Sequence, residues 1–456
     1  MSINIRKYYF KKHNPSRHSF IDLSHGISIL IVNEQMKIAV VKNIKFLSIL
    51  ILFISLNHID VLSQGGSNYS IGGVGEITRT NGAAYDALAG TSIAYPTESA
   101  INTVNPSMWS FATSTRLKGG YKFNQHVNYI DGANLAQNNG KVNGMMGLFS
   151  IDTSLGLSAA IGIYPYSWIN SMVTQTKSVT NPDGVIEGTA LNKAIGGITQ
   201  AFIGASANIT DKISFGAMIF SSFGITSTTI DKTFNNANVY ASSDEIIDSY
   251  DGWGIRTGAF YKVSDDFLLG AFYEFSGNMT IDRQITYKSP SLTVSDSVVS
   301  CSSQFDFPDA FGIGASYKTG KFIFAADFSN QIFSNQTFAD IKFINDKFNY
   351  RNSWSTSLGI ARIGNTGPGT PFLDKITYKI GGGYRSNYIE VNGSGINEVF
   401  GAIGFSAPIP GTMIIDAAIT FGQRGNNTNG NIKEYFGRLS VDVSIGETWF
   451  KPFRRY

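Results

Sequence analysis

Histidine, the side chain most often used for acid–base catalysis near neutral pH, is scarce in this chain. The 456 residues contain five, His13, His18, His25, His58 and His126. The first four precede residue 64, and His126 stands alone between Phe-Asn-Gln and Val-Asn-Tyr. A Ser-His-Asp hydrolase holds its histidine between a nucleophile and an orienting carboxylate. We therefore expect no enzyme, and we expect His126 at the rim of the fold.

Metal-binding and phosphate-binding patterns are also weak. Carboxylates at 242–248 and 264–267 have the oxygen chemistry of Ca²⁺ ligands, but such runs are more often exposed loops and turns. Glycines at 72–75 and 381–383 lack the strand-turn-helix context of a phosphate loop. Cys301 is the single cysteine, so a cysteine metal cluster is excluded. The formal charge of +3 without a basic patch argues against nucleic acid, and no metal or cofactor is predicted.

Residues 36–64 have the layout of a secretory signal peptide. Lysines at 37, 42 and 45 precede an apolar run at 46–56 and a polar end near Gln64. The run is shorter than the roughly 20 residues that span a membrane; an anchoring helix is the alternative. Residues 1–35 precede this signal, and we interpret them as a gene-model extension, the alternative being a long genuine leader.

The rest of the chain repeats one pattern, apolar residues at every second position. The closing stretch EYFGRLSVDVSIGETWF at 434–450 shows it, and period two predicts a β-strand with one apolar and one polar face. Similar runs occur at 253–262, 267–276, 354–362, 376–385 and 413–421. The elements that would position any functional side chain are therefore strands.

Short turns alternate with long polar segments between these runs. Turns such as 209–212 and 318–321 predict antiparallel hairpins, whereas 179–193, 231–250 and 289–303 are expected to be loops. Short turns at one end and long loops at the other are typical of bacterial outer-membrane barrels. We count roughly fourteen strands.

The predicted fold is all-β: a transmembrane antiparallel barrel of about 14 strands formed by residues 115–456. A soluble β-protein fits the alternation too. Aromatic residues near strand ends suit a membrane interface, and the polar faces have few of the Lys and Glu residues that coat soluble sheets. We therefore place the protein in the outer membrane of a Gram-negative bacterium, with outer-membrane lipid as a partner and the barrel-assembly machinery as a partner during biogenesis.

This assignment gives the closing strand a direction. Leu439, Val441, Val443 and Ile445 are expected to face lipid, and Arg438, Ser440 and Asp442 to face the lumen. An arginine at Val441 should impair insertion, whereas an arginine at Ser440 should be tolerated.

Residues 65–114 lack the two-residue period. Alanines and other small residues at 83–94 favour short helical turns or irregular structure. About fifty such residues before a barrel are predicted to lie inside it as an N-terminal plug, or hatch; a disordered periplasmic tail is the alternative.

Several segments together resemble the FadL/TodX-type outer-membrane hydrophobic-compound transporter family, in particular divergent members from Bacteroidetes-like bacteria. The matching residues are AAYDALAGTSIA at 83–94 followed by Asn105-Pro106, IGIYPYSWIN at 161–170, the run at 196–224, GQRGN at 422–426 and the closing strand. The resemblance implies a fourteen-stranded barrel, a lumen blocked by a hatch that contains Asn105 and Pro106, and a lateral opening in the wall. Ser107 stands where the family often has Ala.

The function that the resemblance implies is passive uptake of hydrophobic small molecules, long-chain fatty acids or aromatic hydrocarbons. Phe220 and Phe223 are candidates for an inward apolar pocket that binds such a ligand. Two alternatives stay open: a structural or secretion-linked barrel that binds protein partners and transports nothing, and a water-filled porin.

Overall fold

The computed structural model describes residues 65–78, 82–130, 133–181, 184–236, 239–289, 297–333, 348–391, 393–409, 411–426 and 431–447. They belong to one compact unit, Leu62–Tyr456. The extension predicted at 1–35 and the signal peptide predicted at 36–64 lie outside the described residues. Among those that are described, no helix has the length and apolar character needed to cross a membrane.

Strands dominate the described chain. The elements are η1 (Asn68–Ile71), β1 (Glu76–Ile77), α2 (Ala83–Asp86), η2 (Pro106–Phe111), β2 (Thr115–Ile130), β3 (Ala133–Asp152), β4 (Leu157–Pro165), β5 (Ser167–Asn181), β6 (Gly184–Asn208), β7 (Ile213–Phe234), β8 (Ser242–Lys262), β9 (Phe267–Lys288), β10 (Ser297–Asp306), β11 (Ala310–Thr319), β12 (Phe322–Gln331), β13 (Phe348–Tyr350), β14 (Ser353–Arg362), α3 (Phe372–Lys375), β15 (Thr377–Val391), β16 (Ser394–Pro408), β17 (Met413–Arg424) and β18 (Lys433–Glu447).

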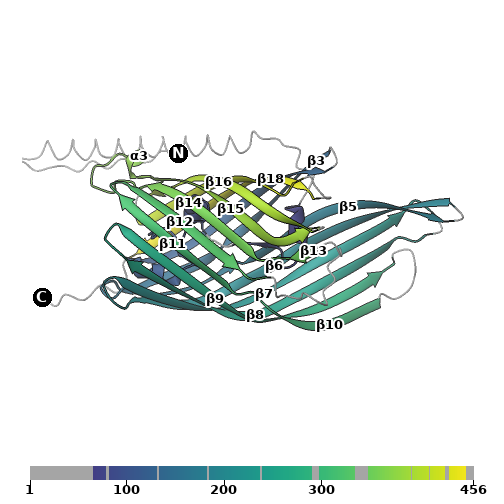
Figure 1. The fold of residues 1–456 in the computed structure, drawn as a ribbon, viewed down its shortest axis with the longest axis horizontal. Coiled ribbons are helices and arrows are strands. Elements are labelled where there is room, and N and C mark those ends of the chain that lie inside the picture. The colour runs from purple at the N-terminus through teal and green to yellow at the C-terminus, as the bar shows by residue number, and fades with distance from the viewer. Residues whose placement is uncertain are drawn as a thin grey trace, which may run out of the picture. The chain divides into compact units, whose positions relative to one another are not determined.

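The wall is a closed antiparallel barrel of fourteen strands, as predicted (Figure 1). β1 does not belong to the wall, and three wall strands are interrupted. β4 and β5 share the neighbour β6, β10 and β11 share β9, and β13 and β14 share β15. β18 pairs with β2 from Lys433–Tyr129 to Glu447–Thr115, and this pairing closes the ring.

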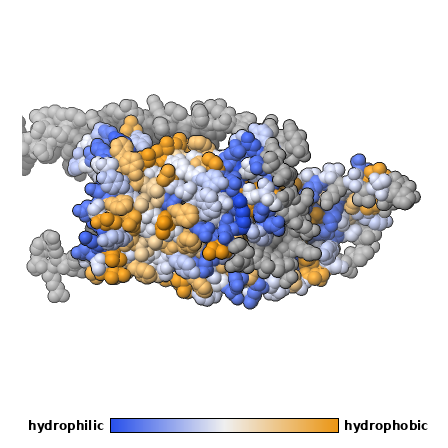
Figure 2. Space-filling model, viewed as in Figure 1, coloured by the Kyte–Doolittle hydropathy of each residue, from blue (hydrophilic) through white to orange (hydrophobic). Residues whose placement is uncertain are grey.

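The two faces of β18 are those the alternation predicts. Ile445 is 54% exposed and Val443 38%, whereas Asp442 and Ser440 are buried. The same phase places apolar side chains outside along the other strands, and Figure 2 shows them as an orange band on the wall, with blue residues on both sides of it. Lipid covers the apolar face. The charged side chains on the inner face therefore need hydrogen-bond and ion-pair partners inside the barrel.

The predicted loops at 179–193 and 231–250 are largely strand, so this part of the prediction was wrong. β6 alone has 25 residues, whereas a barrel strand crosses a membrane with about 9–11. Beyond the bilayer a strand needs no apolar outer face, and its sequence then reads as a polar loop. In Figure 1 the ends of β5, β6 and β10 reach far to the right of the view.

Candidate functional site

The N-terminal segment, defined as residues 65–78 and 82–114, contacts side chains on the inner face of the wall. Asp327 on β12 accepts hydrogen bonds from the backbone N–H groups of Ser92 (2.6 Å) and Ile93 (2.8 Å). Asp442 on β18 accepts one from Ala83 N–H (2.5 Å). These buried carboxylates satisfy backbone donors of the segment that have no strand partner. Whether the segment acts as a hatch stays a prediction.

The first residues of the segment meet the wall where two strands diverge. β3 and β5 do not pair with each other; Gly65 N–H donates to Asn138 O on β3 (3.4 Å) and Gly66 N–H to Asn170 O on β5 (2.8 Å). Further on, Thr78 N–H donates to Tyr166 O (2.8 Å), at the break between β4 and β5. The segment thus ties together the two sides of an irregular stretch of wall.

Asn105 and Pro106, the predicted hatch residues, are anchored in the wall. The Asn105 side chain caps η2 and donates to Ile93 O (2.7 Å). A Cβ atom at Gly258 of β8 would lie 2.0 Å from Asn105 Oδ1, and one at Gly216 of β7 would lie 2.5 Å from the carbonyl carbon of Pro106. Only glycine leaves room for this close approach, so the Asn-Pro element is seated in a slot between β7 and β8.

A buried charged network, here called the charged belt, joins the segment to the wall. It comprises Glu76, Asp86, Lys122, His126, Glu398, Arg424, Glu434 and Arg438. At its centre Arg424 lies 2.7 Å from Glu398, 2.8 Å from Glu76 and 3.5 Å from Glu434. Arg438 also pairs with Glu76, and Lys122 lies 2.8 Å from Asp86.

The two carboxylates that the segment contributes have perturbed acidities. Burial alone would raise the pKa of Glu76, but the charges of Arg424 and Arg438 outweigh it and hold the pKa well below its ordinary value. For Asp86, burial is likewise outweighed, by the charge and hydrogen bond of Lys122 together with Ser440 and Arg438, and the pKa is lowered. Both groups are therefore anionic anchors at neutral pH.

His126 belongs to this belt and not to the rim, so its predicted position was wrong. Its Nδ1 atom lies 3.0 Å from Glu434 Oε1, and the side chain is 2% exposed. Ser67 Oγ donates to the other oxygen of Glu434 (2.8 Å). The Glu434 carboxylate therefore links His126 to the N-terminal segment. This arrangement gives His126 a role in holding the structure together.

A second cluster, here called the apolar cap, surrounds the same segment at Val74. Its members are Val74, Tyr166, Ile198, Tyr250, Met279, Ile281, Phe305, Phe307, Phe333, Tyr388 and Ile389. The bulge between Ser386 and Glu390 turns both Tyr388 and Ile389 inward. Tyr388 O–H lies 3.0 Å from Gly72 O and 2.7 Å from Gly75 O. The Tyr388 hydroxyl therefore adds polar contacts between the apolar cap and the segment.

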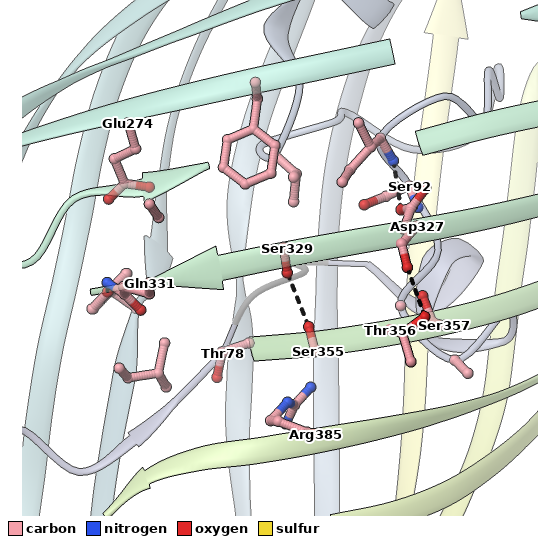
Figure 3. Close-up of a pocket in the computed structure, with 18 of the residues that line it drawn as sticks. Thr78, Ser92, Glu274, Asp327, Ser329, Gln331, Ser355, Thr356, Ser357 and Arg385 are labelled. Atoms are coloured by element: carbon pink, nitrogen blue, oxygen red, sulfur yellow. Dashed lines mark hydrogen bonds between the residues drawn. The ribbon is translucent and has the colours of Figure 1, made fainter. Parts of the chain in front are cut away.

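Small cavities lie between the segment and the wall, and two of them have volumes well above that of one water molecule. One, of about 80 Å³, has mixed lining that includes Ile93, Phe272, Glu274 and Asp327 (Figure 3). The other, of about 60 Å³, is mainly polar. Neither has the roughly 300 Å³ of a typical small-molecule pocket, so neither holds a drug-sized apolar molecule in this arrangement of the segment.

A larger apolar groove of about 990 Å³ lies on the outer face of the wall. Its outward-facing lining comes from β2, β3, β4, β6, β7, β8 and β18: Leu117, Gly119, Met145, Gly147, Phe149, Ile161, Ile163, Ala201, Ile203, Ile219, Ser221, Trp253, Val443 and Ile445. Small residues such as Gly119 and Ala201 stand among large ones, and this difference in size makes the surface concave.

The two predicted pocket residues lie on opposite faces of β7. Phe220 is 3% exposed and packs inside with Trp109 and Met146, while its backbone borders the outer groove. Phe223 is 41% exposed on the outer face. An odd spacing along a strand requires this, and the sequence already contained that signal. A ligand-binding role for either residue stays a prediction.

The charged belt itself was missed from the sequence, although most of its wall residues lie on the polar phase of their strands. The structure also argues against the tolerance predicted for Ser440→Arg, because Ser440 is buried and donates to Asp86 Oδ2 (2.7 Å). A longer cationic side chain at this position would displace Asp86 of the N-terminal segment.

Comparison with solved structures supports the fold. The chain resembles the CymD monoaromatic hydrocarbon channel (TM-score 0.54, 12% identity, covering 82% of this chain and 99% of that chain). It resembles the Pseudomonas putida toluene transporter TodX (0.53, 16%, 82% and 99%) and a Pseudomonas aeruginosa FadL homologue (0.55, 12%, 81% and 99%). The predicted resemblance to the FadL/TodX type is thus confirmed for the architecture.

No curated protein matches the chain. The model of one protein family, BamG, matches residues 41–455 of this chain, which is nearly the whole chain. The fold and this match place the barrel in the outer membrane of a Gram-negative bacterium, as predicted. The chain belongs to the BamG family.

Proposed function

We propose that this barrel is a passive outer-membrane channel for hydrophobic small molecules, which leave sideways through the wall into the bilayer. The outer apolar groove is the observation that carries the proposal. This groove faces lipid, so an apolar molecule that reaches it through the wall can enter the bilayer without returning to water. Long-chain fatty acids and aromatic hydrocarbons are the proposed substrates, and the solved channels of similar fold support that class by their names.

The wall behind the groove is irregular, which favours a lateral route. The pairing of β2 with β3 shifts register between Gly119 and Tyr121, and Gly144 of β3 has φ +99°. Bulges interrupt the hydrogen-bond ladder and bend the strand. A stretch of wall with fewer regular ladder bonds opens at lower cost than a regular one.

An apolar cluster lies directly inside this stretch. Phe202, Phe220 and Met146 border the groove with their backbones and pack in the lumen against Ile101 and Trp109 of the N-terminal segment. A shift of the segment at Trp109 would expose apolar surface inside the same wall. In this mechanism the segment is the hatch, and Asn105 and Pro106 limit how far it moves.

Uptake of labelled oleate or toluene by liposomes that contain the purified barrel tests the proposal. Ala201→Trp fills the groove and should slow uptake roughly tenfold, equivalent to about 1.4 kcal/mol in barrier height. Ala271→Trp, on the outer face of β9 and outside the groove, is the matched control. No uptake above empty liposomes rejects the channel, whereas equal uptake by the two variants rejects only the lateral route.

A second candidate is a barrel that binds protein partners and transports nothing. The observation that favours it is the firm attachment of the N-terminal segment through the charged belt and the apolar cap. Strands such as β6 and β8 extend far beyond the bilayer and provide surface for a partner. Co-purification of a stable protein partner, with no uptake of oleate, toluene or small sugars, would favour this function; permeation by sugars would favour the porin.

A further inference from the structure

The mainly polar cavity, here called the charged chamber, has more cations than anions on its lining. Glu76 and Asp86 are its carboxylates, and Lys122, Lys141, Arg385 and Arg438 are its cations. The chamber lies between the N-terminal segment, near Thr78, and strands β2, β3, β15 and β18. Its cations are partly or fully buried. A buried charge without a counter-charge is energetically costly.

The two carboxylates are already committed to other cations. Asp86 lies 2.8 Å from Lys122 and accepts from Ser440. Glu76 is shared by Arg424 and Arg438. The excess positive charge therefore falls on the remaining two lining cations, Lys141 and Arg385.

Lys141 has no salt bridge with any residue that the structure describes. Its Nζ atom lies 3.4 Å from Thr78 Oγ1 and 5.2 Å from the centre of the Trp168 ring. A hydroxyl and an aromatic face satisfy part of an ammonium group but supply no counter-charge. An anion in the chamber would supply it.

Arg385, on β15, is only weakly paired. Its Nη1 atom is 3.5 Å from Glu398 Oε1, and its buried Nε–H has no hydrogen-bond partner among the described residues. Its side chain lines both the charged chamber and the cavity of about 80 Å³, where Figure 3 shows it near Thr78 and Ser355. A buried donor without an acceptor is destabilising, and an anion beside the guanidinium would supply the counter-charge that the 3.5 Å contact with Glu398 supplies only in part.

We propose that the charged chamber binds one small free anion, a carboxylate or phosphate, between Lys141 and Arg385. A cavity of about 60 Å³ suits this size, because one water needs about 10–15 Å³ of the same measure. The bound anion would neutralise both cations and, through Lys141 and Thr78, add a contact between β3 and the N-terminal segment. This site goes beyond the proposed channel and does not depend on hydrophobe uptake.

The test is isothermal titration of the purified full-length barrel in detergent with inorganic phosphate. The background is sodium gluconate at constant ionic strength, because gluconate is too large for the chamber. We expect saturable binding at one site per barrel, at least tenfold weaker in Lys141→Met. Lys212→Met, at an exposed turn lysine, should bind like the unmodified protein.

Arg385→Gln is the second variant, and it should also weaken binding if Lys141→Met does not fold. Absence of saturable phosphate binding would overturn the proposal, and so would equal binding by both chamber variants and the control. Titration with decanoate separates a free anion from the head group of an amphipathic molecule. If decanoate binds in a way that depends on Lys141 and phosphate shows no binding, the proposal of a free-anion site is overturned.

Discussion

The charged belt and the apolar cap hold the same N-terminal segment by opposite chemistry. In the belt, Glu76 and Asp86 of the segment meet fixed cations of the wall; in the cap, Val74 packs among aromatic and aliphatic side chains. Apolar packing tolerates small shifts, whereas Arg424 meets three carboxylates in one geometry. This difference indicates that the charged belt fixes the position of the N-terminal segment against the wall. The apolar cap keeps water out of the contact around Val74.

Removal of the central cation is expected to have the largest effect. Arg424→Met leaves Glu398 buried without its main cationic partner and removes a cation from Glu76 and Glu434, and the free energy of unfolding should fall by about 3–5 kcal/mol. Urea titration of the heat-modifiable folded form measures it. Lys318→Met, at an exposed lysine, should change it by less than about 0.5 kcal/mol, and an equal change in both variants would show that the belt is not stabilising.

A smaller loss is expected where the segment is seated in the wall. Gly258→Ala drives a methyl group into Asn105 and should cost about 1–3 kcal/mol. Gly252 lies on the same strand and face, and its added Cβ would be no closer than 3.4 Å to any atom. Gly252→Ala should therefore be nearly neutral in the same urea titration; a ranking in the other order would contradict the seating of Asn105.

The cap should respond more weakly to a polar change than the belt. Tyr388→Phe removes the hydroxyl that contacts Gly72 O and Gly75 O but keeps the ring stacked on Phe333 at 4.4 Å. We expect a loss of about 0.5–1.5 kcal/mol, measured by urea unfolding against Tyr287→Phe, at an exposed tyrosine. A loss as large as that of Arg424→Met would erase the distinction between the two regions.

The smallest expected effect is a difference in how the stability of the two regions depends on pH. The pKa of Asp86 is lowered in the folded protein, so its contribution to stability is present above the unfolded value of about 3.9 and is lost as the pH falls through the folded pKa. Asp86→Asn should therefore lose less stability than the unmodified barrel between pH 5 and pH 3. Val74→Ala, in the cap, should lose as much as the unmodified barrel; identical pH profiles for all three proteins would refute the ionic anchor.

The alternation of residues predicts faces but not partners. Leu439 to Ile445 could be assigned to lipid or lumen from the sequence, because every second side chain shares a face. The pairing of Arg424 with Glu398 depends on the register of β16 against β17, which no local pattern reports. The ends of β5, β6, β7 and β8 were read as loops, because these parts extend beyond the membrane and no longer need apolar residues.

The contacts of Asn105 and Pro106 could not be predicted from the sequence either. Its residues were singled out by resemblance, yet the glycines that receive it, Gly216 and Gly258, lie on strands far along the chain. Glycine in a strand has several uses, so the sequence could not tell which ones face the segment. Only the closed barrel brings these positions together.

The closure of β18 on β2 has a consequence for biogenesis. The N-terminal segment is made before any wall strand, yet β18, the last one, binds it through Ser440 and Asp442. Once the first and last strands pair from Lys433 to Glu447, the wall forms a closed ring. We therefore expect the segment to contact the inner face of the sheet before the ring closes, so that the strands assemble around it.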